Sequence, residues 1–403
     1  MKITNIIQND IAAAYPEIHS TRLNTLFTFI DSGMHDQRVS VTYLGRGLKS
    51  LSKTTKKNDI KRADRLIGNT LLHSERLFFY DYMSAQLIGN KKSPIILVDW
   101  SPINGQGMFQ VLRASIPMNG RSLTLYEKIH PESELNTNKA HQAFLDTLEQ
   151  ILPEGCMPII VSDAIYRAPW FKIVEEKNWY WIGRVRGRVS LSQDKQEWKT
   201  SYQWFADARI GKADNLGSIY YGKTAKFPCN AAIYKRTPKG RKAKKKRGGT
   251  SQRTTDKVHQ KDAKEPWLLV FNLPEKFMKS AKTAVNLYSQ RMQIEENFRD
   301  TKNNKLGIGL ECANSRSVNR FDNLLLIAAL ILYLLWCIGC AAVMKKTHYS
   351  LQANTQKARM VLSIITIARE IIDDDRYFIP LEEYIYVLSE LSNLTVNIEG
   401  LHE

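Results

Sequence analysis

Apolar and polar positions follow different periods along the chain and divide it into helical and strand-rich segments. Up to about residue 90 the apolar positions recur at helical spacing, which predicts an all-helical region. Residues 39–51 predict a short helix within it. Residues 56–72 predict a second, basic helix, for which Asn58 or Asp59 is the expected N-cap.

The pattern changes between residues 94 and 187. A short apolar run at 94–100 is followed by two segments of partial alternation, as in a meander of three strands. A helix, a buried strand, a second helix and a fifth strand follow, at 139–152, 158–163, 168–177 and 180–189. The predicted order is therefore β-β-β-α-β-α-β, and the predicted fold class is α/β.

The rest of the chain completes a five-part organisation. From about 190 to 270, short β-like pieces surround a Gly/Ser/Thr-rich stretch, and residues 266–274 predict another strand. A single helix is expected at about 283–302, followed by helices to the end. The predicted parts are a helical region at 1–90, a core at 91–188, a β-rich insertion at 189–272, a second core segment at 273–345 and a helical region at 346–403.

One helix raises the question of a membrane. Residues 324–344 contain no charged side chain, and this segment is long enough to span a bilayer. A helix that is apolar all round also occurs in the core of a large protein. There is only one such run, and basic residues on both sides of it give little orientation information. The basic charge balance of the chain, which is typical of a nucleic-acid-binding protein, favours the buried helix. Cys337 and Cys340 then become core residues of that helix, rather than a redox or zinc motif.

The charge balance points to a polyanionic partner. The chain has a formal net charge of +18, and residues 235–247 alone hold nine cations and no anion. Nucleic acid is the commonest partner of such a chain, and sequence-independent phosphate contact is the default role of the run. The two predicted helices before residue 72 then suit a helix-turn-helix-like DNA reader, with a plain helical bundle as an equal alternative. The five scattered cysteines fit a reducing cytoplasm.

Three acidic residues are candidates for chemistry. Asp99 and Asp163 each end a predicted apolar strand, where side chains reach the open edge of a sheet. For either aspartate alone, an ordinary cap or loop hydrogen bond is the simpler interpretation. With Glu295 on a later helix they form a three-carboxylate set, which suits two Mg²⁺ ions and phosphoryl transfer.

The helix that carries Glu295 presents an unusual stripe. On a helical wheel at about 100° per residue, Tyr288, Arg291, Glu295, Arg299 and Lys302 fall within roughly 80° of one another. The simpler interpretation is a solvated face with ion pairs four residues apart. The alternative is that the carboxylate binds metal while its basic neighbours contact DNA.

The spacing of Tyr288, Arg291, Glu295 and Lys302 resembles the YREK signature of bacterial insertion-sequence DDE transposases, in the subgroup that includes the tetracycline-resistance transposon. The resemblance implies a ribonuclease-H-like catalytic core with a mostly β insertion, a helical DNA-end-binding region before it and a helical region after it. It also implies that Asp99, Asp163 and Glu295 are the catalytic metal ligands. Further DNA contacts are implied for Tyr288, Arg291, Arg299 and Lys302, for Trp267 as a base-stacking residue, and for Arg184 and Arg186 on one strand face.

The same resemblance implies the reaction and the partners. Cut-and-paste transposition would proceed by a 3′ nick, a hairpin, hairpin opening and strand transfer, with two Mg²⁺ ions that Mn²⁺ can replace. Double-stranded DNA is the implied partner, both the terminal inverted repeats and the target, and the protein would act as a homodimer on two ends. A cytoplasmic, nucleoid-associated location without a membrane follows. The alternatives are a catalytically inactive DNA-binding relative and a ribonuclease-H-fold nuclease that only cuts.

Overall fold

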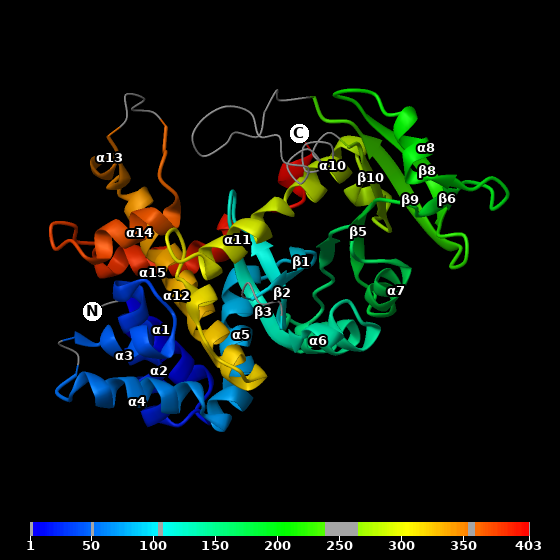
Figure 1. The fold of residues 1–403 in the computed structure, drawn as a ribbon. Coiled ribbons are helices and arrows are strands. Elements are labelled where there is room, and N and C mark those ends of the chain that lie inside the picture. The colour runs from blue at the N-terminus through cyan, green and yellow to red at the C-terminus, as the bar shows by residue number, and fades with distance from the viewer. Residues whose placement is uncertain (1–2, 50–51, 104–107, 238–264, 354–358, 403) are drawn as a thin grey trace, which may run out of the picture. The chain divides into compact units, whose positions relative to one another are not determined.

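The computed structural model describes residues 3–49, 52–103, 108–237, 265–353 and 359–402 (Figure 1). The chain is mixed α/β, with many helices and a large mixed sheet, so the predicted fold class is confirmed at this level. It divides into two compact units. The first comprises Met1–Lys92, Val98–Cys156 and Met292–Val396, and the second comprises Ser93–Leu97, Met157–Arg291 and Asn397–Glu403.

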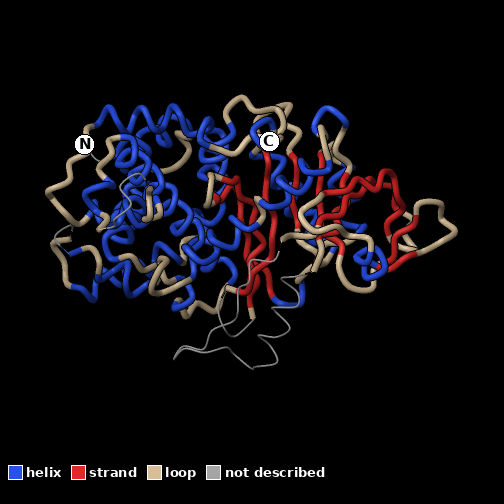
Figure 2. Tube along the Cα trace, turned by 90° about the horizontal axis from the view of Figure 1, so that it is seen from above, coloured by secondary structure: helices blue, strands red, loops and turns tan. Residues whose placement is uncertain are grey.

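The first unit is mostly helical, and the expected all-helical start of the chain is confirmed. Its early helices are α1 (Ile3–Ala14), α2 (Ser20–Asp36), α3 (Val41–Arg46), α4 (Lys56–Ile67) and α5 (Thr70–Ile88). Its later helices are α6 (Asn138–Ile151), α11 (Met292–Lys302), α12 (Val318–Met344), α13 (His348–Leu351), α14 (Ile364–Ile372) and α15 (Leu381–Leu394). Figure 2 colours helices and strands separately, so the contrast with the strand-rich second unit can be followed there.

The start of α4 differs from the prediction. Thr55 is the N-cap, since its hydroxyl accepts a hydrogen bond from the Asn58 amide at 3.4 Å. Asp59 is instead buried, and its carboxylate accepts hydrogen bonds from Ser52 at 2.6 Å and Thr54 at 2.8 Å. The cap prediction is wrong because three candidate cap residues lie within one turn, and only their side-chain partners distinguish them.

Helix α12 is the central element of the first unit. It packs against α2, α5, α14, α15 and strand β3, and its residues from Phe321 to Ala342 are buried. Among the described residues it is the one helix long and apolar enough to cross a membrane, and its most apolar window is wholly inside the protein. The prediction of a buried helix is therefore confirmed. Cys337 and Cys340 are buried within it, and burial raises the pKa of both thiols.

A polar side chain anchors this apolar helix. Asp322, which is 1% exposed, accepts a hydrogen bond from the Ile129 amide of β3 at 2.9 Å. It also contacts Arg76 and His73 of α5, each at 3.1 Å. A buried carboxylate is stable only with such partners. Asp322 therefore joins α12 to α5 and to the sheet.

Three strands of the first unit lie in the order β3-β2-β1, where β1 is Ile95–Pro102, β2 is Phe109–Pro117 and β3 is Ser122–Pro131. Strands β2 and β3 pair antiparallel, with a register shift between Ala114 and Ser115. Strand β1 is shared, because its residues 95–97 belong to the second unit and the remainder to the first.

The second unit is rich in strands. From β1 the order continues β4-β5-β10-β9-β8-β6-β7. The strands are β4 (Ile159–Ser162), β5 (Tyr180–Val185), β6 (Ser190–Ser192), β7 (Lys199–Thr200), β8 (Ala213–Tyr221), β9 (Phe227–Tyr234) and β10 (Trp267–Phe271). Strands β4 and β5 are parallel, whereas β10 pairs antiparallel with both β5 and β9. Its helices are α7 (Ala168–Glu176), α8 (Ser201–Ala206) and α10 (Ala281–Ser289).

The element order β1-β2-β3-α6-β4-α7-β5 is the predicted one, so that expectation is confirmed. The single helix predicted at about 283–302 is wrong, because α10 ends at Ser289 and α11 begins at Met292. At the break, Gln290 and Arg291 donate their amides three residues back, to Leu287 and Tyr288, which tightens the turn. The Ser289 hydroxyl also donates to the Asn286 carbonyl at 2.6 Å, an acceptor that a continuing helix would use.

Candidate functional site

Asp163 follows β4 directly and has a defined polar environment in the second unit. Its carboxylate Oδ1 accepts a hydrogen bond from the Tyr288 hydroxyl at 3.1 Å, and its Oδ2 lies 3.9 Å from Arg291 Nη1. The Asp163 side chain is 35% exposed, so one side of it is open to solvent. Two residues of the YREK spacing, Tyr288 and Arg291, therefore contact the carboxylate of Asp163.

The charges around Asp163 keep it ionised. Burial by itself raises the pKa of Asp163, but Arg291, the Ala164 amide, the Tyr288 hydroxyl and Arg184 together hold that pKa below its ordinary value. Burial, followed by the charge of Asp163, raises the pKa of Tyr288. The phenol therefore stays protonated and remains a hydrogen-bond donor.

The two arginines predicted on one strand face both reach the same acidic residue, although the strand is shorter than predicted. Arg184 is in β5, which ends at the buried Val185, and Arg186 directly follows that strand. Both pair with the same carboxylate oxygen of Glu265, at 3.1 Å for Arg184 and 2.5 Å for Arg186. In the structure their charge is thus partly neutralised by a residue that the sequence pattern did not indicate.

Trp267 is the first residue of β10 and is half-buried among aromatic rings. Its ring meets the Tyr288 ring edge-on, with centroids 5.1 Å apart, and lies 6.2 Å from Tyr234. The Arg236 guanidinium lies over the indole at 4.8 Å from its centroid. A cation above a tryptophan face is a favourable contact, and it shows that this face is reachable by charged groups.

Asp99 lies in β1 within the first unit and is half-buried. Its Oδ1 accepts a hydrogen bond from the Trp100 amide at 2.9 Å. Two residues later, Ser101 lies on the same side of the strand, because alternate residues share a face. Asp99 was predicted at the end of its strand. In the structure it lies three residues before the end, because β1 continues to Pro102.

Lys302, the last residue of the YREK spacing, reaches this strand. Its ammonium donates to Ser101 Oγ at 2.6 Å and to the Pro102 carbonyl at 3.0 Å. Burial, together with the charge of Arg113, lowers the pKa of Lys302 to about 8, although Glu311 and Asp99 act in the opposite direction. Tyr288 and Arg291 of the signature therefore contact Asp163, whereas Lys302 lies beside the strand that holds Asp99.

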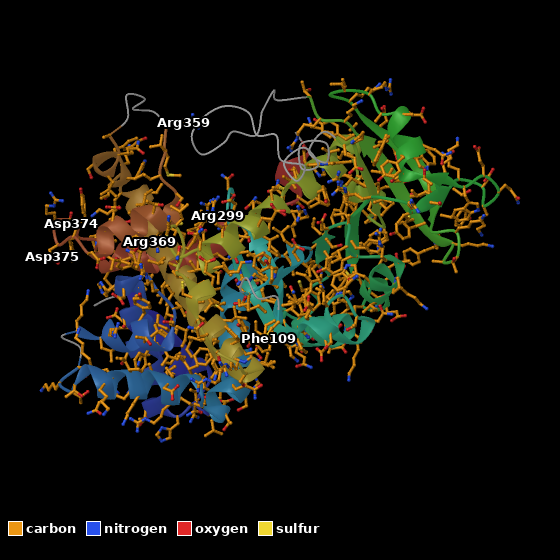
Figure 3. The ribbon with its side chains drawn as sticks, viewed as in Figure 1. Phe109, Arg299, Arg359, Arg369, Asp374 and Asp375 are labelled. Atoms are coloured by element: carbon orange, nitrogen blue, oxygen red, sulfur yellow. The ribbon has the colours of Figure 1, made fainter. Side chains whose placement is uncertain are left out.

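Glu295 is in the first turn of α11 and is exposed to solvent. Arg299 is also exposed and is labelled in Figure 3. It forms an ion pair with Glu296, three residues before it. Arg121, from the β2–β3 hairpin, contacts Glu296 at 3.2 Å and Asp300 at 2.8 Å. Glu296, which lies off the predicted stripe, thus has a structural role in holding the helix.

The opposite side of α11 is bound to the β2–β3 hairpin. The side-chain Oε1 of Gln293 accepts a hydrogen bond from the Met118 amide at 3.0 Å. The backbone carbonyl of Gln293 accepts one from the Ser122 hydroxyl at 3.2 Å. The side-chain Nδ2 of Asn297 donates to the Ser122 carbonyl at 2.6 Å. Gln293 and Asn297, four residues apart, are buried against the hairpin on this side of α11. Glu295 and Arg299 lie on the other side of the helix and therefore face outward.

The donor chemistry of the three predicted acids suits a hard divalent cation. Carboxylate oxygens are the ligands that Mg²⁺ prefers, and the depressed pKa of Asp163 keeps that ligand deprotonated. In the part of the chain that the structure describes, no group of three or more His, Cys, Asp or Glu side chains is gathered into a metal cluster. The ligand set of Asp99, Asp163 and Glu295 stays a prediction.

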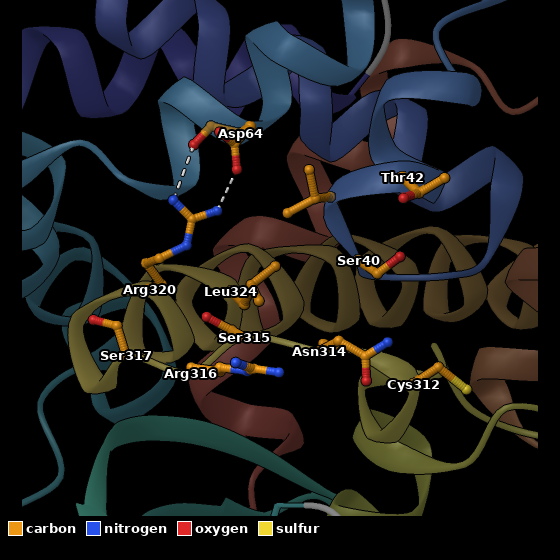
Figure 4. Close-up of a pocket in the computed structure, with 12 residues that line it drawn as sticks. Ser40, Thr42, Asp64, Cys312, Asn314, Ser315, Arg316, Ser317, Arg320 and Leu324 are labelled. Carbon is orange, nitrogen blue, oxygen red and sulfur yellow. Dashed lines mark hydrogen bonds and ion pairs between the residues drawn. The ribbon is translucent and has the colours of Figure 1, made fainter. Parts of the chain in front are cut away.

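A pocket of about 510 Å³ lies in the first unit, away from the predicted residues (Figure 4). Its polar lining comes from the start of α3, from α4 and from the segment that leads into α12. Arg320 is held there by Asp64, whose backbone carbonyl it also contacts at 3.4 Å. None of the sequence-predicted site residues lines this pocket.

Two contact residues of the site were missed in the sequence. Ser101 had a signal, since it lies two positions after Asp99 and shares its strand face. Glu265 had none, because its pairing with β5 depends on the register between β5 and β10. Of the basic run at 235–247, Lys235, Arg236 and Thr237 belong to the described residues, and the remainder lies outside them.

Residues 90–334 match the family described as "Transposase DDE domain". The matched segment contains β1, β4 and α11, and with them the three predicted acids. A comparison with curated protein sequences found no match.

Proposed function

Because the chain belongs to the family of transposases with a DDE domain, we propose that it moves a DNA element by cut-and-paste transposition. The proposed series is a 3′ nick at the element end, formation of a hairpin, opening of that hairpin and joining of the freed 3′-hydroxyl to target DNA. Each step is an in-line displacement at phosphorus, so one site can serve all four. The family match over residues 90–334 is the observation that carries the proposal.

The core would have the ribonuclease-H-like arrangement. The order β1-β2-β3-α6-β4-α7-β5, with β2 and β3 antiparallel and β4 and β5 parallel, supports this. On the same proposal, residues 189–272 are the insertion, 1–90 bind the DNA ends, and 346–403 are an accessory helical region. The placement in the YREK subgroup rests on Tyr288, Arg291, Glu295 and Lys302.

Asp99, Asp163 and Glu295 are the proposed ligands of two Mg²⁺ ions, which Mn²⁺ can replace. Members of this family generally use divalent metal ions. When bound, such ions stabilise the attacking and leaving oxygens of a phosphoryl transfer. Tyr288 would orient the Asp163 carboxylate through its hydroxyl, and Arg291 would keep that carboxylate ionised.

The basic and aromatic residues are the proposed DNA contacts. Arg299 is exposed on α11, and Lys302 is half-buried beside Ser101, so both are available to phosphates on the side that carries Glu295. Trp267 would stack an extruded base during hairpin formation, which is worth roughly 1–3 kcal/mol. Arg184 and Arg186 would contact the backbone, in competition with Glu265.

The transposase family implies a DNA substrate. We propose double-stranded element ends and target DNA as the partners, a homodimer that holds two ends, and a cytoplasmic location on the nucleoid. The burial of α12 supports a protein that does not use this helix to span a membrane. Cell fractionation tests the location, because a membrane-spanning protein would resist extraction by salt.

The decisive experiment incubates purified protein with Mg²⁺ and labelled DNA that carries the inverted repeats flanking the gene. Hairpin ends and joined products are expected. Asp99→Asn, Asp163→Asn and Glu295→Gln should each abolish both products while end binding persists. Asp375→Asn, at an exposed acid of the first unit, is the matched control and should behave as the wild type.

Other outcomes would contradict the proposal in distinguishable ways. Nicks without hairpins or joining would favour a ribonuclease-H-fold nuclease. Retarded DNA without any cleavage would favour an inactive DNA-binding relative. Cleavage that persists in one of the three acidic variants would remove that residue from the catalytic set.

A further inference from the structure

A buried arginine joins three elements of the first unit. Arg113 of β2 is 1% exposed. Its Nε donates to Glu127 Oε2 of β3 at 2.7 Å, and its Nη1 donates to Thr301 Oγ1 of α11 at 3.0 Å. The same Nη1 also donates to Asn297 Oδ1 of α11. One guanidinium therefore connects the β2–β3 hairpin to α11 by directed hydrogen bonds.

The side of α11 that receives Arg113 is buried and specific. Asn297 and Thr301 are 2% and 1% exposed and lie four residues apart, so they share a face. The Phe298 ring lies under the guanidinium, and its centroid is 4.5 Å from the Arg113 Cζ atom. Asn297 is held from its other end by the Ser122 carbonyl. These contacts fix both the rotation of α11 and its position along its own axis.

Stability alone does not account for this arrangement. Burial raises the pKa of Glu127, and the Arg113 charge opposes that rise. A buried ion pair can often be replaced by apolar side chains without loss of stability, because desolvation offsets much of the attraction. A planar fork of donors, by contrast, selects one geometry of its acceptors. The role that remains for Arg113 is to select one placement of α11 against the sheet.

We propose that Arg113 is a positioning residue for Glu295 and Lys302 and acts through α11, an inference that rests on the proposed function. Glu295 is in the first turn of this helix, and Lys302 at its last position reaches Ser101 on β1. A slip of one residue would move a side chain by about 1.5 Å along the axis and turn it by about 100°. Catalytic groups must be held to within about 0.5 Å, so such a slip would disable the site.

Three variants of the full chain test the proposal. Thr301→Val and Asn297→Ala each remove one acceptor of Arg113, and Arg113→Lys keeps the charge without the fork. Asn319→Ala, at an exposed position of α12, is the matched control. Hydrogen exchange of peptides from residues 292–302 should accelerate by about tenfold in the three variants, as expected for the loss of one buried hydrogen bond. The control should leave this exchange unchanged.

The second measurement is the Mg²⁺ concentration for half-maximal DNA cleavage. It should rise by about 10- to 100-fold in the three variants, the usual effect of losing a residue that orients metal ligands, while end binding is retained. Unchanged exchange of residues 292–302, or an unchanged Mg²⁺ requirement, would overturn the proposal. A wild-type protein that binds DNA but never cleaves it would refute the proposed function instead. In that case the exchange rates alone would still decide whether Arg113 holds α11. If Arg113→Lys fails to fold, the two acceptor variants keep the test intact.

Discussion

The Tyr288 hydroxyl donates a hydrogen bond to Asp163 at 3.1 Å, across 125 positions of sequence. This contact links the first residue of the YREK spacing to an aspartate that the sequence singled out only by its place after a strand. It gives Tyr288 a role inside the protein, because the residue is only 3% exposed. It also provides a direct handle on the ionisation of Asp163.

Tyr288→Phe should raise the pKa of Asp163 and lower the free energy of unfolding at pH 7 by about 1 kcal/mol, since one hydrogen bond to the carboxylate is lost. The pKa of Asp163 is depressed in the folded state, so its ionisation stabilises the protein above the ordinary value of 3.8. This stabilisation is lost as the pH falls through the folded pKa, and the difference between variant and wild type should shrink there. Urea denaturation across this range, with divalent metals chelated, measures the effect.

Tyr202→Phe is the control for this experiment, because Tyr202 is 58% exposed in the same unit. It should leave both the stability and its dependence on pH unchanged. Identical pH dependence in the Tyr288→Phe variant and the wild type would contradict a role of this hydroxyl in the ionisation of Asp163.

Lys302 should make DNA affinity sensitive to mildly alkaline pH. Because burial lowers the pKa of Lys302 to about 8, the free protein loses this positive charge as the pH rises through that value. Binding must then take up a proton, so affinity should fall by up to about tenfold per pH unit. Lys302→Arg should remove this dependence, since arginine stays charged. Fluorescence anisotropy with element-end DNA measures it.

Lys305→Arg is the matched substitution at an exposed lysine three residues further along. It should keep the pH dependence of the wild type. An affinity of wild-type protein that stays constant through this pH range would show that Lys302 does not contribute a titrating charge to DNA binding.

Glu265→Gln should strengthen DNA binding and make it more sensitive to salt. Glu265 pairs with both Arg184 and Arg186, and its neutralisation leaves two cations available for phosphates. The slope of log affinity against log salt should steepen by about 0.9 for each arginine that gains a phosphate contact. Filter binding at several salt concentrations measures the slope.

Glu197→Gln is the comparison, because Glu197 is 72% exposed and contacts a single lysine at 3.5 Å. It should change the slope little. If Glu265→Gln also leaves the slope unchanged, Arg184 and Arg186 do not face DNA.

Trp267→Ala should reduce hairpin formation more than the first nick. Loss of stacking worth roughly 1–3 kcal/mol predicts a decrease of about 5- to 150-fold in the hairpin step. Trp267→Phe, which retains an aromatic face, should keep part of the activity. Gel analysis of nicked and hairpin products over time separates the two steps.

Trp198→Ala provides the control at a tryptophan whose indole donates to the Lys195 carbonyl in a surface turn. Its hairpin yield should equal that of the wild type. Equal loss of nicking and hairpin formation in Trp267→Ala would indicate that Trp267 supports the packing of Tyr288 instead of stacking a base.

Local pattern alone was enough to predict the order of the helices and strands in the first part of the core. The run from residue 94 to 187 gave the correct element order, because the period of apolar positions differs between strands and helices. The burial of α12 was likewise predictable, since a helix that is apolar all round needs cover on every side. The prediction of one continuous helix over residues 288–302 was wrong, because the helix breaks after Ser289. There the side chains of Ser289 and Gln290 donate to the Asn286 carbonyl.

Tertiary structure decided which residues meet. Tyr288 reaches Asp163, Lys302 reaches Ser101, and Arg113 links α11 to the β2–β3 hairpin. Each pair joins positions more than a hundred residues apart, and polar side chains can satisfy their hydrogen bonds with many partners. Periodicity reports which face of an element is buried. The partner on that face depends on strand register and helix placement, which no local pattern encodes.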